Sequence, residues 1–167
     1  MDVEALYKIQ HALDQKITEK HRLHGMKLID KKILALQVEL GELANETRCF
    51  KFWSVKPASA RPVILEEYVD ALHFVLSIGL EAGFQHKVIL TWGDFEESGG
   101  EQELTAAFLK AYDQIATFAR QLDLAAYLDM FKAILSLGHA LGFSWPEIKQ
   151  AYLQKNEVNH LRQEHGY

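Results

Sequence analysis

Apolar residues recur every three or four positions along most of the chain, and this spacing places side chains on one face of an α-helix. In the first segment the repeated apolar residues are Leu6, Ile9, Leu13 and Ile17. In the second segment they are Ile33, Leu36, Leu40 and Leu43. The pattern predicts helices over residues 2–22, 31–48, 62–83, 101–121, 123–141 and 145–165. Strand-like alternation of useful length is absent from the sequence, so we expect an all-α helical bundle.

Residues at the ends of these segments have the types that begin or end helices. Asp30 is expected to cap the second helix, and Pro62 suits the first turn of the third, which Gly83 ends. Ser144 and Glu147 form a capping box for the last helix. The stretches 49–60 and 84–100 show no helical period, and we expect loops there.

Composition narrows the class of protein. A chain of 167 residues, 49% hydrophobic and 25% charged, suits one folded domain, which we expect to span residues 1–167. The single cysteine, Cys49, builds no disulfide framework and fits a reducing, cytoplasmic location. No apolar run reaches the roughly 18 residues that cross a bilayer. A net charge of −5 disfavours nucleic acid as a partner, but a small anionic substrate remains compatible because a bound metal reverses the local sign.

Four acidic residues are the most informative feature. Glu39 and Glu42 lie three residues apart on the second predicted helix, and Glu67 and Asp70 repeat that spacing on the third. Because a helix turns about 100° per residue, each pair points in one direction. Helical geometry places both pairs beside alanine, valine, isoleucine and phenylalanine rather than within a charged face. A lone E-x-x-E pair is usually a solvated surface feature, but two apolar-bordered pairs on consecutive helices favour a common site.

The chemistry of such a site follows from repulsion between carboxylates. Burying unpaired acids costs several kcal/mol per ion, and divalent cations relieve that cost. Oxygen ligands without histidine or cysteine suit Mg²⁺, with Mn²⁺ as a substitute. Magnesium usually keeps coordination positions for water and substrate phosphates. The four acids therefore predict Mg²⁺-assisted work on a phosphate compound.

These residues also carry a family resemblance. The pair E-x-x-E, followed after 24 residues by E-x-x-D, resembles the metal motif of the all-α nucleoside triphosphate pyrophosphatases, which include MazG-type enzymes and dCTP pyrophosphatases. Further segments resemble the dimeric dUTPase family: QHALD at 10–14, FKFWSVK at 50–56 and DALHF at 70–74. Residues 152–167 are similar to its ending Y-x-x-K-x-x-x-N-x-x-R-x-x-x-G-Y. Asp14 stands where many relatives have asparagine.

The resemblance implies a function and a set of roles. It implies Mg²⁺-dependent hydrolysis of dUTP, with dUDP as a further candidate, to dUMP and pyrophosphate by a homodimer. Two or three ions would be held by Glu39, Glu42, Glu67 and Asp70. The nucleophile would be water, with no covalent enzyme intermediate, and Glu39 or Glu42 would act as general base. The loop around Trp53 would reach towards the partner's site.

The substrate residues follow partly from spacing and partly from the resemblance. Lys155, Asn159 and Arg162 share one helical face, and two cations with an amide suit a polyphosphate. Basic residues near a helix C-terminus also complement the helix dipole, which is the alternative interpretation. The full set of candidate substrate residues is Gln10, Asp14, Trp53, Lys56, His73, Phe74, Tyr152, Lys155, Asn159, Arg162 and Tyr167.

Two other functions remain open from the sequence. A dCTP pyrophosphatase or a broad-specificity enzyme would share the metal site and differ in how it recognises the base. A non-catalytic helical module would use the acidic face to bind a protein partner. Neither a nucleic acid nor a membrane is an expected partner.

Overall fold

The computed structural model describes residues 3–88 and 104–165, and in these ranges it contains α-helices and no strands. The helices are α1 (Val3–Lys20), α2 (Ile29–Thr47), α3 (Arg61–Glu81), α4 (Leu104–Gln121), α5 (Leu124–Ala140) and α6 (Trp145–His165). The all-α prediction is confirmed, and each of the six predicted helices is present. Residues 49–60 form a loop as expected. Of the second predicted loop, 84–100, only residues 84–88 are described.

The ends of α3 and α6 agree with the sequence predictions. Pro62 lies in the first turn of α3. At its other end Gly83 has a φ of +71°, and the N–H of Phe84 donates to the carbonyl of Gly79 at 2.8 Å. This left-handed residue and its backbone bond form a Schellman ending, which glycine adopts without steric cost. Before α6, the carboxylate of Glu147 accepts from the backbone N–H of Ser144 at 2.8 Å.

The predicted cap of α2 is wrong. The helix begins at Ile29, so Asp30 lies inside the first turn, where its charge still favours the helix dipole. The residue before the helix is Leu28, whose side chain makes no capping hydrogen bond. Its backbone N–H instead donates to the carboxylate of Glu81 on α3, at 3.1 Å. A contact between helices thus replaces the local cap that the sequence suggested.

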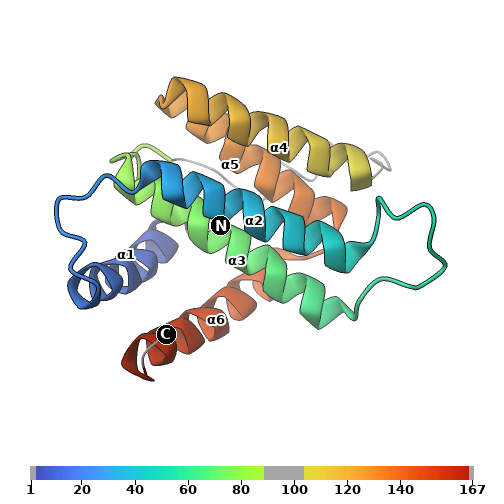
Figure 1. The fold of residues 1–167 in the computed structure, drawn as a ribbon, viewed down its shortest axis with the longest axis horizontal. Coiled ribbons are helices and arrows are strands. Elements are labelled where there is room, and N and C mark those ends of the chain that lie inside the picture. The colour runs from blue at the N-terminus through green and yellow to red at the C-terminus, as the bar shows by residue number, and fades with distance from the viewer. Residues whose placement is uncertain (1–2, 89–103, 166–167) are drawn as a thin grey trace.

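Helix α3 lies at the centre of the molecule, between α2, α5 and the pair formed by α1 and α6 (Figure 1). Its residues Tyr68, Leu72 and Leu76 are fully buried, as helices covered on several sides require. The two neighbours α2 and α3 run antiparallel, while α4 packs on α5. This arrangement places the inner faces of α2 and α3 opposite the α1–α6 pair.

Glycines allow buried tyrosines to approach the helix backbones. The hydroxyl of Tyr127 lies 2.6 Å from that of Tyr7 and donates to the carbonyl of Val75 at 2.9 Å. A Cβ at Gly79 would overlap both phenol groups. Tyr68 similarly donates to the carbonyl of Ile134 at 3.1 Å, where a Cβ at Gly138 would overlap its ring. The buried hydroxyls therefore find partners inside the core, as they must to avoid a desolvation cost.

Among the described helices, none is both long and apolar enough to cross a membrane alone, although α5 and α6 pass that test of length and composition jointly across a bend of 108°.

Candidate metal and substrate site

The acidic residues of α2 and α3 converge where the two helices pack. Glu39, Glu67 and Asp70 each present a carboxylate oxygen, and these oxygens lie within 4.8 Å of one another. The convergence follows from the antiparallel packing, which brings the Glu39 turn of α2 opposite the Asp70 turn of α3. Glu42 is exposed and outside this group of three, although its charge acts on both Glu39 and Glu67. Three of the four predicted metal ligands thus form one cluster, with the fourth at its edge.

Burial and mutual repulsion disfavour negative charge on these carboxyls. Burial, followed by the charges of Asp70, Glu42 and Glu67, raises the pKa of Glu39 to about 7. Burial and then the charges of Asp70 and Glu42 raise the pKa of Glu67 in the same direction. The pKa of Asp70 is also raised, chiefly by burial. Such a cluster is stabilised by positive charge placed between its oxygens.

Helix α6 supplies positive charge to the cluster. The Nζ atom of Lys155, which is buried, lies 2.6 Å from Asp70 Oδ2 and 2.7 Å from Glu66 Oε1. Burial lowers the pKa of Lys155, but hydrogen bonds to Asp70 and Glu66 outweigh this and raise it above its usual value. Glu66 was not identified from the sequence. Its position directly before Glu67 was the available signal, but adjacent helix residues point in different directions.

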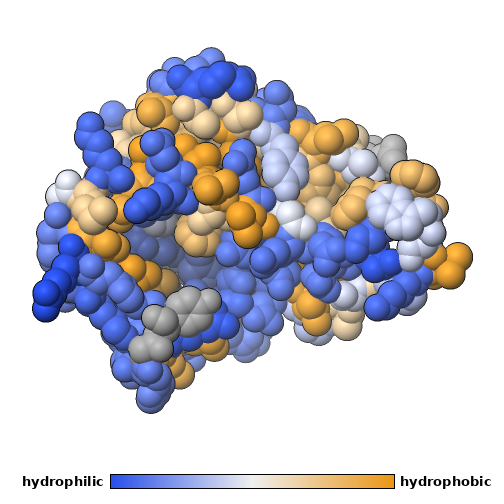
Figure 2. Space-filling view, in the orientation of Figure 1, coloured by the Kyte–Doolittle hydropathy of each residue, from blue (hydrophilic) through white to orange (hydrophobic). Residues whose placement is uncertain are grey.

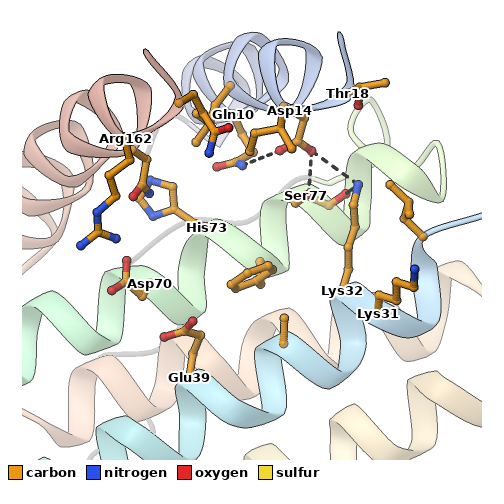
Figure 3. A pocket seen from close by; sticks show the side chains of 17 residues that line it. Gln10, Asp14, Thr18, Lys31, Lys32, Glu39, Asp70, His73, Ser77 and Arg162 are labelled. Atoms are coloured by element: carbon orange, nitrogen blue, oxygen red, sulfur yellow. Dashed lines mark hydrogen bonds and ion pairs between the residues drawn. The ribbon is translucent and has the colours of Figure 1, made fainter. Parts of the chain in front are cut away.

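A pocket of about 440 Å³ opens from the cluster between α1, α2, α3 and α6 (Figure 3). Eight of the candidate metal and substrate residues line it: Gln10, Asp14, Glu39, Asp70, His73, Phe74, Asn159 and Arg162. Figure 2 shows hydrophilic and hydrophobic side chains side by side on the face of the molecule in view. From its lining residues, the pocket has an acidic end at Glu39 and Asp70 and, beyond it, polar and aromatic side chains.

At the end away from the cluster, Asp14 is the centre of a hydrogen-bond network (Figure 3). Its Oδ1 accepts from Gln10 Nε2 at 2.8 Å, and its Oδ2 accepts from Ser77 Oγ at 2.6 Å. Behind it, the buried hydroxyl of Tyr152 donates to Gln10 Oε1 at 2.7 Å. The bond from Tyr152 fixes the orientation of the Gln10 amide, with its nitrogen towards Asp14.

Lys32 joins this network and was missed by the sequence analysis. Its Nζ lies 2.9 Å from Glu81 Oε2, 3.4 Å from the carbonyl of Ser77 and 3.6 Å from Asp14 Oδ2. The signal available in the sequence was its position seven residues before Glu39, which places both side chains on one face of α2.

The middle of the pocket carries an unusual histidine. The ring of His73 stacks on Tyr152 with centroids 4.0 Å apart, and its Nδ1 lies 2.7 Å from the carbonyl of Val69. Burial lowers the pKa of His73 to about 4, so the ring is neutral at neutral pH. Since Nδ1 donates to the carbonyl, Nε2 carries the lone pair. This buried acceptor has no hydrogen-bond partner in the described part of the chain.

Two predicted substrate residues lie on the loop after α2, away from the pocket lining. Trp53 is 64% exposed, and its ring packs against that of Phe52 with centroids 4.9 Å apart. The carbonyl of Lys56 accepts from Arg48 Nε at 3.0 Å, and Arg48 Nη2 donates to Ser54 Oγ at 2.6 Å. The structure therefore holds this loop against the end of α2 with its aromatic side chains outside.

The remaining predicted residues have different relations to the pocket. Glu42, Glu67, Tyr152 and Lys155 do not line it, but they adjoin it through Glu39, Asp70 and Gln10. Tyr167, predicted to bind substrate, lies outside the described residues.

The comparison with protein families covers almost the entire chain. Residues 2–167 match the model of the family described as dUTPase. The match includes the acidic residues of α2 and α3, the network around Asp14 and the whole of α6. No curated protein matches the chain.

Proposed function

The chain belongs to this dUTPase family and is a hydrolase that acts as a dUTP diphosphatase, and from that premise we propose a Mg²⁺-dependent reaction that releases dUMP and pyrophosphate. The observation that carries the proposal is the convergence of Glu39, Glu67 and Asp70 within 4.8 Å at one end of a nucleotide-sized pocket. The family membership supports the chemistry, and the cluster supports its location.

The donor set fits a hard divalent cation. Its members are carboxylates, burial raises the pKa values of Glu39, Glu67 and Asp70, and Lys155 offsets only part of the charge. We propose that Glu39, Glu42, Glu67 and Asp70 hold two or three Mg²⁺ ions, for which Mn²⁺ would substitute. When bound, these ions supply positive charge that polarises the phosphate and lowers the pKa of water.

Side chains of the protein then take up the proton of the attacking water and bind the phosphates, including those that leave as pyrophosphate. A water oxygen attacks phosphorus, the bond to the pyrophosphate oxygen breaks, and Glu39 or Glu42 takes the proton of the water. Glu39 lines the pocket, whereas Glu42 lies at the edge of the cluster, so Glu39 is the better placed of the two. The side chains of Asn159 and Arg162, which line the pocket, would bind the phosphates, and Lys155 beside Asp70 would add positive charge next to them.

The part of the pocket away from the acidic cluster suits a deoxynucleoside. Phe74 offers an apolar surface to the sugar, where a deoxyribose lacks the 2′-hydroxyl. Within the part of the chain that the structure describes, the Nε2 atom of His73 is an acceptor without a partner, and a sugar hydroxyl would satisfy it. Gln10 and Asp14, behind which Tyr152 lies, would contact the base. Tyr167 remains a proposed substrate residue from the resemblance alone.

Exposed apolar side chains on the loop after α2 support a homodimer. Phe52 is 94% exposed, Trp53 64% and Val55 104%, which is a costly arrangement for a surface that stays in water. We propose that this loop packs on a second copy and brings Trp53 and Lys56 towards the partner's pocket. The single cysteine supports a cytoplasmic location, and the net charge of −5 is compatible with a small anionic substrate because a bound metal would reverse the local sign.

A hydrolysis panel tests the proposal directly. The purified chain is assayed with dUTP, dCTP, dTTP and UTP, with Mg²⁺, with Mn²⁺ and with EDTA, and the products are separated by chromatography. We expect dUMP and pyrophosphate from dUTP with either metal and none with EDTA. Preference for dCTP, or equal turnover of all four nucleotides, would instead support the dCTP or broad-specificity alternative. Turnover that persists in EDTA would contradict the metal assignment.

A further inference from the structure

We infer that Lys32 determines base specificity: its ammonium group donates to a ring carbonyl of the pyrimidine and makes the pocket select uracil over cytosine. The inference rests on the proposed function, because it assumes that a nucleotide binds with its phosphates at the acidic cluster. No motif in the sequence assigns a role to Lys32, whose contacts in the pocket are with Asp14, Ser77 and Glu81.

The antiparallel packing of α2 and α3 places Lys32 at the base end of the pocket. Lys32 precedes Glu39 by seven residues on α2, and Ser77 follows Asp70 by seven residues on α3. At about 1.5 Å per residue, each separation is roughly 10 Å along the helix axis, comparable with the length of a nucleoside. Figure 3 shows Lys32 and Ser77 together at one end and Glu39 with Asp70 at the other. Phosphates at the acids therefore direct the base towards Lys32.

The polar atoms at this end form an ordered pattern. Asp14 is in the centre, with Gln10 Nε2 on its Oδ1 side at 2.8 Å and Lys32 Nζ on its Oδ2 side at 3.6 Å. The amide nitrogen of Gln10 faces Asp14 because Tyr152 donates to the amide oxygen. A ligand edge that approaches these three groups therefore meets a donor, an acceptor and a donor.

Each of the three groups keeps hydrogen-bonding capacity for a ligand. The ammonium of Lys32 has three N–H bonds, of which Glu81 and the carbonyl of Ser77 accept two. Its 3.6 Å separation from Asp14 is too long for a hydrogen bond. Within the described residues the second N–H of Gln10 Nε2 has no acceptor, and the Asp14 carboxylate accepts two hydrogen bonds out of about four possible.

This pattern is complementary to uracil and not to cytosine. The edge of uracil presents a carbonyl, an N–H and a second carbonyl, so it offers acceptor, donor and acceptor in either orientation. On cytosine the ring N3 is an acceptor and would face the carboxylate of Asp14. Its exocyclic amino group would face either Lys32 or the Gln10 amide, donor against donor. Two of the three contacts are thus repulsive for cytosine, and buried polar groups without partners are costly.

Nucleotide binding tests the inference without depending on catalysis. The affinities of dUMP and dCMP are measured by calorimetry in Mg²⁺ for the wild type, Lys32→Met and Lys31→Met. Lys31 also lines the pocket and carries the same charge, so it is the matched control. We expect the wild type to favour dUMP and Lys32→Met to lose tenfold or more in dUMP affinity, with dCMP affinity lowered by less than threefold. Lys31→Met should leave the ratio of the two affinities unchanged.

Several results would overturn the inference. These are equal affinity of the wild type for both nucleotides, an equal loss for both in Lys32→Met, or a change of the ratio by Lys31→Met as large as that by Lys32→Met. Lys32→Arg, which keeps the charge and donors, should restore part of the preference. If Lys32→Met lacks helical circular dichroism, Lys32→Gln, with a shorter neutral side chain, replaces it under the same criteria. A wild type that prefers dUMP but does not hydrolyse dUTP would refute the proposed function and leave this inference standing.

Discussion

The ammonium of Lys155 lies 2.6 Å from the Oδ2 atom of Asp70, so the last helix of the chain contributes a cation to acids held by α2 and α3. Because Lys155 is buried and also contacts Glu66, this pair is more than a surface ion pair. The chain thus balances part of the acidic charge by itself. What remains unbalanced on Glu39 and Glu67 is the charge that a metal would offset.

Replacing Asp70 tests the metal site. Asp70→Asn keeps the shape of the side chain but removes its charge, so Mg²⁺-dependent hydrolysis of dUTP should fall by about 100-fold or more. Glu157→Gln, an exposed acid on α6, is the matched control and should retain activity. Helical circular dichroism should be unchanged in both variants. Asp70→Asn with normal turnover would remove this carboxylate from the site.

Arg162 lines the pocket and offers a planar pair of donors to phosphate oxygens. Arg162→Gln should raise the KM for dUTP about tenfold and lower kcat/KM accordingly, because the charge-assisted contacts to the phosphates are lost. Steady-state kinetics measures both constants. Arg162→Lys retains the charge but not the planar guanidinium, so its KM should lie between those of the wild type and Arg162→Gln. Identical kinetics in all three proteins would contradict a role of Arg162 in phosphate binding.

The acidic cluster should make the metal-free protein sensitive to pH. The pKa of Glu39 is raised to about 7 from 4.5, so the folded state binds more protons than the unfolded state between these values. The free energy of unfolding should therefore decrease as pH rises from about 4.5 to 7, by on the order of 1 kcal/mol for a half-buried group screened by solvent. His73, with a pKa lowered to about 4, acts in the opposite direction below pH 6.5.

The contribution of Glu39 to the pH dependence of stability is obtained by comparing the wild type with Glu39→Gln. Urea unfolding in EDTA is measured at several pH values for the wild type and Glu39→Gln. The difference in free energy between the two proteins should change across pH 4.5–7, because only the wild type carries the titrating carboxyl. Mg²⁺ should restore stability at pH 8 in the wild type. A difference that stays constant with pH would contradict the raised pKa.

The buried tyrosines make Gly138, like Gly79, intolerant of substitution. A Cβ at Gly138 would overlap the ring of Tyr68, so Gly138→Ala should lower the free energy of unfolding by about 1–3 kcal/mol. At Gly41 an added Cβ would lie 3.3 Å from the hydroxyl of Tyr112, which is only partly buried. Gly41→Ala should therefore be close to neutral, because the gain in helix propensity offsets that contact. Thermal unfolding distinguishes the two, and equal melting temperatures would argue against the tight packing.

The oligomeric state tests the role of the exposed loop. Trp53→Ser removes the indole at the centre of the exposed aromatic cluster, and sedimentation velocity should show a shift from dimer towards monomer. Leu122→Ser, an exposed apolar residue between α4 and α5, is the control and should leave the dimer intact. A monomeric wild type would contradict the proposed dimer.

Periodicity was sufficient to predict the helices, because few glycines or prolines interrupt them and several, such as α1 and α2, bury one apolar face. The spacing of the acids was equally informative, since residues three apart share a helix face whatever the helix packs against. Asp30 was misassigned as a cap because a local pattern does not reveal that Leu28 has its hydrogen-bond partner on another helix.

Contacts between helices explain what the sequence analysis missed. Lys32 and Ser77 are ordinary residues along the chain and become part of the site only through Asp14 on α1. The placement of Trp53 and Lys56 depends on a loop and, under the proposed dimer, on a second copy, and neither follows from helical spacing. Glu66 gains its importance only from Lys155, which is 89 positions away in sequence.

The hydrogen bond from Tyr152 to Gln10 has one more consequence. Tyr152 and Arg162 both belong to helix α6, where they are ten residues apart and therefore separated by about 15 Å along the helix axis. The side chain that orients the amide beside Asp14 and the side chain proposed to bind the triphosphate therefore have a fixed separation along one helix. Under the proposed function, a shift of α6 would displace the contacts to the base and the contacts to the phosphates together.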